Sequence, residues 1–222
     1  MSLIGRKSRP LARSDRTLRD DRLFIVACDD TYAPKQYFDF FKITRVHVHV
    51  VPTTDGTSSA PHVLERLEGF KIGEDDERWM LLDTDHCTED SHIATFLEAI
   101  QVARQKGIKV ALSRPCFELW LLLHHVDGSA VRHLKNARDT ETALRNILGN
   151  YNKNKLEERH YPIDKLADAL MHSKRLDGSV LGGDNPESPT SRVHNLWKAI
   201  ISKALPSQLP AALRDLGPEF LR

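Results

Sequence analysis

The sequence predicts an α/β fold with a mainly parallel sheet flanked by helices and a C-terminal helical extension. From residue 22 to about residue 128, short apolar strands alternate with amphipathic helices, and the connections are long enough for crossovers between parallel strands. Helical patterns without an evident strand fill the rest of the chain. With 222 residues and 40% apolar content, the chain can build one sizeable core with a helical lobe packed on it.

The bulk composition excludes several classes of protein. The formal net charge is +1, so any basic patch for nucleic acid must be local. No apolar run approaches the ~20 residues of a membrane helix, and the charged N-terminus lacks the apolar core of a signal peptide. Three scattered cysteines argue against a disulfide framework or a zinc ribbon. We therefore expect a cytoplasmic protein that has no contact with the membrane.

Residues 1–21 are predicted to form a basic N-terminal arm. Basic residues outnumber acidic ones there, which suits contact with a phosphate backbone. The candidate nucleic-acid contacts in this arm are Arg6, Lys7, Arg9 and Arg13. The alternative is a solvated, poorly ordered terminus.

The first two strand–helix units follow the arm. The apolar run 23–28 predicts a buried strand that ends at Asp29 and Asp30, and Pro34 then opens a helix, because its missing N–H costs nothing in the first turn. Residues 45–51 alternate valine with arginine and histidine, which indicates a half-exposed strand near a sheet edge. The polar loop 53–59 leads to a helix that begins at Pro61.

The third strand is the centre of the predicted site. The apolar run that starts at Trp79 ends abruptly at Asp83 and Asp85. The carboxyl ends of parallel strands line the ligand crevice in such sheets, and residues two apart in an extended segment point the same way. Two carboxylates held that close favour a hard divalent cation, Mg²⁺ or Mn²⁺. The alternative is that these aspartates cap the next helix.

The remaining elements complete the alternation and then depart from it. A helix closed by Gly107, a strand at 108–112 and an apolar helix at 117–123 are predicted next. In the extension, helices are predicted at about 130–149, 163–176, 190–205 and 209–216.

Acidic residues follow three of the predicted parallel strands. They are Asp29, the pair Asp83 and Asp85, and Glu118. Carboxylates that converge from different strands can hold a divalent metal that polarises a phosphoryl oxygen and readies a water for attack. The alternatives are that Asp29 and Asp30 cap a helix, and that Glu118, if buried, pairs with Arg114. The chain contains no P-loop motif G-x-x-x-x-G-K-[ST].

Several segments, in order from about residue 22 to 203, resemble the RloB-like family. They are Cys28-Asp29-Asp30 followed by Tyr37-Phe38, the W-x-x-x-D-x-D-x-H segment from Trp79 to His86, the stretch S-R-P-C-F-E-L-W-L-L-L-H at 113–124, Tyr151-Asn152-Lys153, and P-T-S-R-V-H-N-L at 189–196. The stretch at 113–124 is the most specific of these, whereas a D-x-D alone is a weak signal.

The resemblance implies a Toprim-like α/β domain over 22–128 and a helical extension over 129–222. Toprim domains hold Mg²⁺ with an acid after the first strand and a later D-x-D. By position these acids are Asp29, Asp83 and Asp85, with Glu118 as a support or further ligand. The resemblance therefore predicts a metal-dependent nuclease of bacterial phage defence or restriction loci, acting on DNA or RNA beside an AAA-type ATPase encoded nearby. His86 and Arg114 are further candidate contacts to nucleic acid.

The sequence departs from the family pattern around its first strand. Asp29 stands where the family has the longer glutamate, and Asp30 stands where it has glycine. Ala33 and Pro34 stand where it has threonine and a second acid. A catalytically degenerate effector or adaptor, which binds an ATPase or nucleic acid without cleaving it, is therefore the alternative.

Overall fold

A five-stranded sheet organises the molecule. The computed structural model describes residues 21–30, 32–53, 56–85, 90–216 and 220. The strands are β1 (Arg22–Cys28), β2 (Val46–Val51), β3 (Glu77–Asp83), β4 (Lys109–Arg114) and β5 (Thr190–Ser191). Their order in the sheet is β2-β1-β3-β4-β5. The first four strands are parallel and only β5 is antiparallel, which confirms the predicted α/β class.

The burial of each strand follows its sequence pattern. In β1, residues Phe24 to Cys28 are all buried, as the continuous apolar run of a central parallel strand requires. In β2, Val46 and Val50 are buried while His47 and His49 are exposed, and this strand forms one edge of the sheet. The alternation of residues 45–51 was therefore a correct sign of an edge strand.

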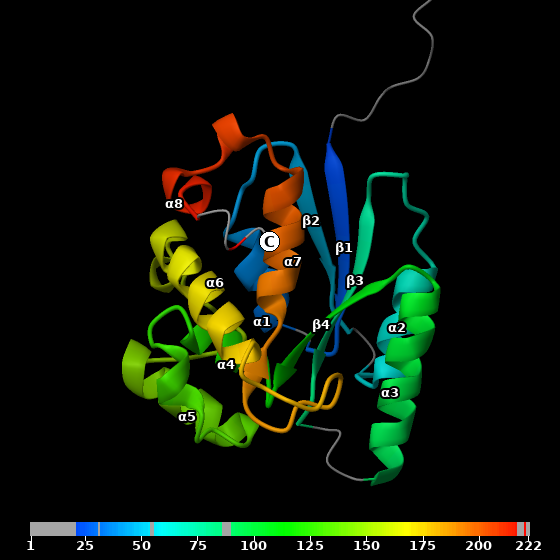
Figure 1. Cartoon of the computed structure of the whole chain (residues 1–222), viewed down its shortest axis with the longest axis horizontal. Coiled ribbons are helices and arrows are strands. Elements are labelled where there is room, and N and C mark those ends of the chain that lie inside the picture. The colour runs from blue at the N-terminus through cyan, green and yellow to red at the C-terminus, as the bar shows by residue number, and fades with distance from the viewer. Residues whose placement is uncertain (1–20, 31, 54–55, 86–89, 217–219, 221–222) are drawn as a thin grey trace, which may run out of the picture.

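Helices cover both faces of the sheet (Figure 1). One face carries α2 (Ala60–Glu68) and α3 (Asp90–Gln105), and the other carries α1 (Ala33–Asp39), α4 (Glu118–Leu122), α6 (Ile163–Asp177) and α7 (Val193–Lys203). Two further helices, α5 (Ala137–Leu148) and α8 (Ala211–Arg214), pack at the outer side of this second layer. Among the described helices, none has both the length and the apolar character needed to cross a bilayer.

Local signals explain where these helices start and stop. Pro61 occupies the first turn of α2, and its apolar residues at helical spacing, Val63 and Leu67, are buried against the sheet. After α3, Gly107 takes a φ of +69°, which suits glycine far better than other residues. Its N–H donates to the carbonyl of Arg104, so the chain turns directly into β4.

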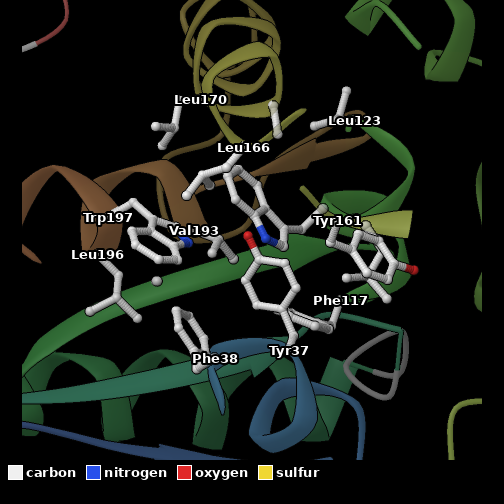
Figure 2. Close-up of a cluster of buried hydrophobic side chains, with 14 of the residues drawn as sticks. Tyr37, Phe38, Phe117, Leu123, Tyr161, Leu166, Leu170, Val193, Leu196 and Trp197 are labelled. Carbon is white, nitrogen blue, oxygen red and sulfur yellow. The ribbon is translucent and has the colours of Figure 1, made fainter. Parts of the chain in front are cut away.

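The larger part of the core is an aromatic cluster between the sheet and the C-terminal helices (Figure 2). Tyr37 lies at its centre and meets Trp120 and Trp197 edge to face, at ring-centroid distances of 6.1 and 6.4 Å. The Tyr37 hydroxyl and His124 Nε2 form a buried hydrogen bond of 3.1 Å. Burial lowers the pKa of His124 to about 3, so the histidine is a neutral member of the core at physiological pH.

The C-terminal extension is helical, as predicted, but it also contributes a strand. The helix predicted at about 130–149 divides into a 3₁₀ turn at Gly128–Val131 and α5, whose N-terminus is capped by the side chain of Asn136. The expectation of no strand beyond residue 128 is wrong, because β5 pairs with the end of β4. Two residues are too few to leave a periodic pattern, so only the tertiary contact defines this strand.

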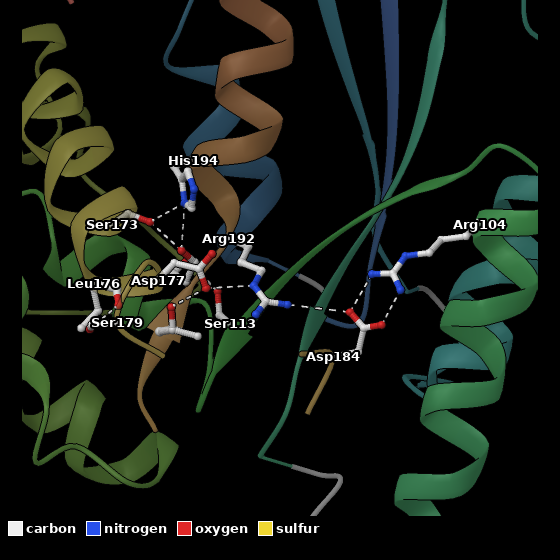
Figure 3. Close-up of polar contacts among 11 residues, drawn as sticks. Arg104, Ser113, Ser173, Leu176, Asp177, Ser179, Asp184, Arg192 and His194 are labelled. Carbon is white, nitrogen blue, oxygen red and sulfur yellow. Dashed lines mark hydrogen bonds and ion pairs between the residues drawn. The ribbon is translucent and has the colours of Figure 1, made fainter. Parts of the chain in front are cut away.

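A polar network fastens the extension to the opposite helical layer (Figure 3). Arg192 donates from Nε to Asp177 Oδ1 at 2.9 Å, and its Nη1 lies 3.7 Å from Asp184 Oδ1. The Asp184 carboxylate also pairs with both terminal nitrogens of Arg104 on α3. The loop 178–189 therefore spans from α6 to α3 across the end of β4.

Candidate functional site

Asp29 and Asp83 lie side by side at the carboxyl ends of the two central strands. The parallel register places Cys28 of β1 opposite Leu81 of β3, so the residues that follow meet at the same edge. Asp29 Oδ2 accepts a 2.7 Å hydrogen bond from the backbone N–H of Asp83. The structure thus brings these two predicted site residues together, while their role as metal ligands stays a prediction.

The side chain of the neighbouring Asp30 contacts the start of α1. Its Oδ1 accepts hydrogen bonds from the backbone N–H groups of Tyr32 at 2.5 Å and Ala33 at 3.2 Å. These contacts satisfy N–H groups at the start of α1 that have no partner within the helix. Asp30 therefore binds the start of α1 from outside the N-cap position, which is Tyr32, so neither aspartate is the N-cap residue itself, and the carboxylate of Asp29 turns to β3.

The acidic edge is electrostatically strained. Burial is the largest cause that raises the pKa of Asp29, to about 7, with smaller contributions from the charges of Asp30 and Asp85. Burial also raises the pKa of Asp83 well above its ordinary value, and the charges of Asp29 and Glu118 raise it further. Like charges in a poorly solvated place disfavour ionisation, and a bound cation would relieve that cost.

The D-x-D segment is held by the loop after β4. The backbone N–H groups of Thr84 and Asp85 both donate to the carbonyl of Pro115, each at 3.1 Å, and the N–H of Thr84 also lies 3.0 Å from the carbonyl of Ser113. Asp83 Oδ1 is buried and has no hydrogen-bond partner among the residues that the structure describes. A buried carboxylate oxygen without a donor is costly, which makes this atom available to a ligand.

Glu118 lies at the same edge, within the helical layer of the aromatic cluster. Its side chain is buried, and its Oε1 accepts a 2.8 Å hydrogen bond from the hydroxyl of Tyr151. Burial raises the pKa of Glu118, and the Tyr151 hydrogen bond opposes that shift.

The alternative that Arg114 pairs with Glu118 is wrong, since Arg114 Nη1 contacts Asn185 Oδ1 at 3.4 Å. Tyr151 was missed as a site residue, although it belongs to the Y-x-K element of the sequence.

A cavity of about 460 Å³ opens beside the Asp29–Asp83 pair, between α2 and α3. Its lining comes from two strand ends, from the start of α2 and from the first turns of α3: Asp29, Ser58, Ser59, Ala60, Pro61, Leu82, Asp83, His92, Thr95 and Phe96. Its polar residues outside the aspartate pair were not predicted. The polar loop 53–59 was a usable signal, because it follows a parallel strand at this same edge.

Arg66 fixes the cavity wall to the acidic edge. Its Nη2 donates to the carbonyl of Cys28 at 2.7 Å, and its Nη1 donates to the carbonyl of Thr57 at 3.1 Å. One guanidinium therefore ties α2 to the end of β1 and to the loop after β2. This fork geometry holds two backbone segments at once, which a lysine could not reproduce.

None of the predicted contacts to nucleic acid lies in the described part of the site. Arg6, Lys7, Arg9, Arg13 and His86 lie outside the described residues. Arg114 is partly buried at the end of β4 and lines no part of the cavity.

The oxygen ligands at the acidic edge suit the predicted metal. In the part of the chain that the structure describes, no group of three or more His, Cys, Asp and Glu is already arranged as a metal site. The Asp29–Asp83 pair nevertheless offers hard oxygen ligands, raised pKa values and one oxygen to which no described group donates a hydrogen bond. These residues fit a hard divalent cation that keeps several waters, as Mg²⁺ does.

Comparison with known proteins assigns the family. Residues 24–200 match the family described as RloB-like protein. No curated protein and no solved structure matches the chain. The matched region contains the Asp29–Asp83 pair, Glu118 with Tyr151, and the helices of the extension through most of α7. The chain belongs to the RloB-like protein family.

Proposed function

We propose that this protein is a metal-dependent, phosphodiester-cleaving enzyme with Toprim-like chemistry. One observation carries the proposal: two carboxylates from adjacent parallel strands meet beside a cavity, and Asp83 presents a buried oxygen that no described donor satisfies. The carboxyl edge of a parallel sheet is where such folds bind ligands. The raised pKa values of both aspartates support a cation as the missing partner.

The chain's own residues would divide the chemistry as follows. Asp83 and Asp85 hold Mg²⁺ or Mn²⁺, and Asp29 is a third ligand or a general base. A bound ion of this kind polarises a phosphoryl oxygen and lowers the pKa of a water. Glu118, fixed by the Tyr151 hydroxyl, keeps negative charge close to Asp83 and serves as a support. The bonds from Thr84 and Asp85 to Pro115 keep the D-x-D segment in place.

The direct test is metal-dependent cleavage of DNA, tRNA and other RNA. Asp83→Asn and Asp85→Asn should each reduce cleavage in Mg²⁺ or Mn²⁺ by at least about a hundredfold, because each removes a ligand charge. Glu98→Gln is the matched control, since Glu98 is an exposed carboxylate on α3 that does not line the cavity. Cleavage that survives both aspartate changes contradicts the proposal.

In the cell, we propose a role in a bacterial phage-defence or restriction-associated system. Membership of the RloB-like family supports this role. We propose nucleic acid as the target and an AAA-type ATPase encoded nearby as the partner. Plating efficiency of phages on cells that carry the native locus or its Asp83→Asn version tests the role. Equal plating on both strains contradicts it.

A specific observation favours a second candidate, a non-catalytic adaptor. Ala33 and Pro34 are buried in the first turn of α1, where the family pattern has its second acid, and Asp30 Oδ1 is already bound by the backbone N–H groups of Tyr32 and Ala33. Calorimetric titration with Mn²⁺ separates the candidates. Binding that depends on Asp83 supports the enzyme, and no binding at millimolar Mn²⁺ supports the adaptor.

A further inference from the structure

The cavity beside the acidic pair has two kinds of wall. Its floor is apolar: Leu82 at the end of β3 and Phe96 on α3 are almost fully buried, and Ala60 and Pro61 belong to the start of α2. Its rim is polar and exposed, with Ser58 and Ser59 on one side. On the other side the rim is formed by His92 and Thr95, which are also exposed. A ligand that fits both walls has an apolar, flat or compact body and polar groups at its edges.

The charge of the lining restricts how a phosphate can enter. Among the described residues that line it, the cavity has two carboxylates and neither lysine nor arginine. No cationic side chain of the described lining can therefore pair with a phosphate there, and a divalent cation held at the acidic pair would supply that positive charge. Binding of a phosphate-bearing ligand in this cavity should consequently require the metal.

The position of the cavity restricts the form of a nucleic-acid substrate. It reaches from the strand ends down between α2 and α3 to core residues of that face, and the two helices pack directly against each other. A base that is stacked and paired inside a duplex cannot enter such a space unless it is first unpaired and unstacked. A base in a single strand is already free to do so.

We propose that the cavity binds the base and sugar of one unpaired nucleotide whose phosphate meets the metal held by Asp83 beside Asp29, so that the preferred substrate is single-stranded nucleic acid. This inference rests on the proposed function, and it names the substrate class of the same site. The apolar floor takes the base, the Ser58 hydroxyl and the His92 ring offer hydrogen bonds to its edges, and the acidic pair takes the metal. The Ser59 hydroxyl already forms a 2.8 Å hydrogen bond with His62 Nδ1 and completes the rim.

The first experiment measures binding without cleavage. A fluorescein-labelled oligonucleotide, made as DNA and as RNA, is titrated with the whole protein as a single strand or annealed to its complement. Ca²⁺ replaces Mg²⁺ as the oxygen-binding divalent ion. Fluorescence anisotropy should show the single strand binding at least about tenfold more tightly than the duplex, and EDTA should abolish the difference. Equal affinities for the two forms overturn the inference.

The second experiment tests the cavity itself. Thr95→Leu places a larger apolar side chain on the rim, and Ala94→Leu is its matched control, because Ala94 is an exposed neighbour on α3 that does not line the cavity. Thr95→Leu should weaken single-strand binding at least about tenfold and leave duplex binding unchanged, whereas Ala94→Leu should change neither. A nucleoside 5′-monophosphate should compete with the oligonucleotide in the wild-type protein, which tests the cavity even where Thr95→Leu impairs folding.

The outcomes separate this inference from the proposed function. If Asp83-dependent cleavage persists while single strand and duplex bind equally, and Thr95→Leu has no effect, the site is an enzyme site that takes no unpaired nucleotide. If Asp83→Asn leaves Mn²⁺ binding and cleavage unchanged, the proposed function itself fails. Selective loss of single-strand binding in Thr95→Leu, with Mn²⁺ binding intact by calorimetry, supports this inference, and Asp83-dependent cleavage supports the proposed function.

Discussion

The face of the sheet under α1, α4, α6 and α7 buries a dense set of aromatic rings, whereas the face under α2 and α3 buries mainly aliphatic side chains and contains the cavity. Asp29 and Asp83 border the cavity on the second face, while Glu118 is enclosed on the first by Tyr151. The acidic edge therefore has two parts. Asp29 and Asp83 form its open half, which borders the cavity, and Glu118 forms its closed half. In the open half, Asp83 Oδ1 has no hydrogen-bond donor among the described residues, whereas in the closed half Glu118 accepts a hydrogen bond from Tyr151.

This difference between the two faces explains the composition of the stretch 113–124, which is the most specific part of the resemblance to the family. In the signature at 113–124, the apolar residues from Phe117 onward are buried, and only Glu118 belongs to the acidic edge. The stretch is therefore chiefly a packing motif that supports the closed half. The open half depends on single aspartates at strand ends, which are weak signals in sequence.

The largest expected effect is on stability, from the aromatic face. Trp120→Ala removes a fully buried indole that packs on Tyr37, and it should lower the free energy of unfolding by about 3–5 kcal/mol. Ile100→Val, in the core of the other face, should cost about 0.5–1.5 kcal/mol. Urea denaturation measures both. A loss below about 1 kcal/mol for Trp120→Ala would contradict the close packing of this indole on Tyr37.

The next effect concerns pH and the open half. The pKa of Asp29 is about 7 in the folded chain against an ordinary value of 3.8. The folded state therefore binds more protons than the unfolded state within this window, and stability should fall as the pH rises from about 4 to about 7. The shift from 3.8 to about 7 corresponds to at most about 4 kcal/mol, because one pKa unit is about 1.4 kcal/mol.

Asp29→Asn tests that pH dependence. In EDTA, the variant should lose less stability than the wild type between about pH 5 and about pH 8, with a residual fall from Asp83, whose pKa is also raised. Urea midpoints at the two pH values provide the measurement, and Glu98→Gln is the control. A fall as steep in Asp29→Asn as in the wild type would mean that Asp29 is not the strained carboxylate.

A smaller effect is expected in the closed half. Tyr151→Phe deletes the donor to Glu118 and leaves a buried carboxylate with one hydrogen bond fewer, which should cost about 1–3 kcal/mol at pH 8. The raised pKa of Glu118 means that the cost should shrink as the pH falls and the carboxyl becomes protonated. Chemical denaturation at two pH values measures this. A cost that grows on acidification would contradict the assigned hydrogen bond.

The sequence predicts some of these features and not others, for physical reasons. Parallel pairing brings strand ends to one edge, so the meeting of Asp29 with Asp83 follows from the order of the elements. The partner of Glu118 does not, because Tyr151 lies 33 residues away in the extension and only packing joins them. The short strand β5 is likewise defined by its contact with β4 and not by any periodic pattern of its own.

The smallest effect is expected where the two helical layers are linked across the sheet. Asp184 pairs with Arg104 of α3 and lies near Arg192, yet the Arg104 side chain is 55% exposed, so water and salt screen the interaction. Asp184→Asn should therefore cost less than about 1 kcal/mol, and high salt should reduce the difference further. Urea denaturation at low and high salt measures this. A loss of several kcal/mol that persists at high salt would instead show that the loop 178–189 is a main support of both layers.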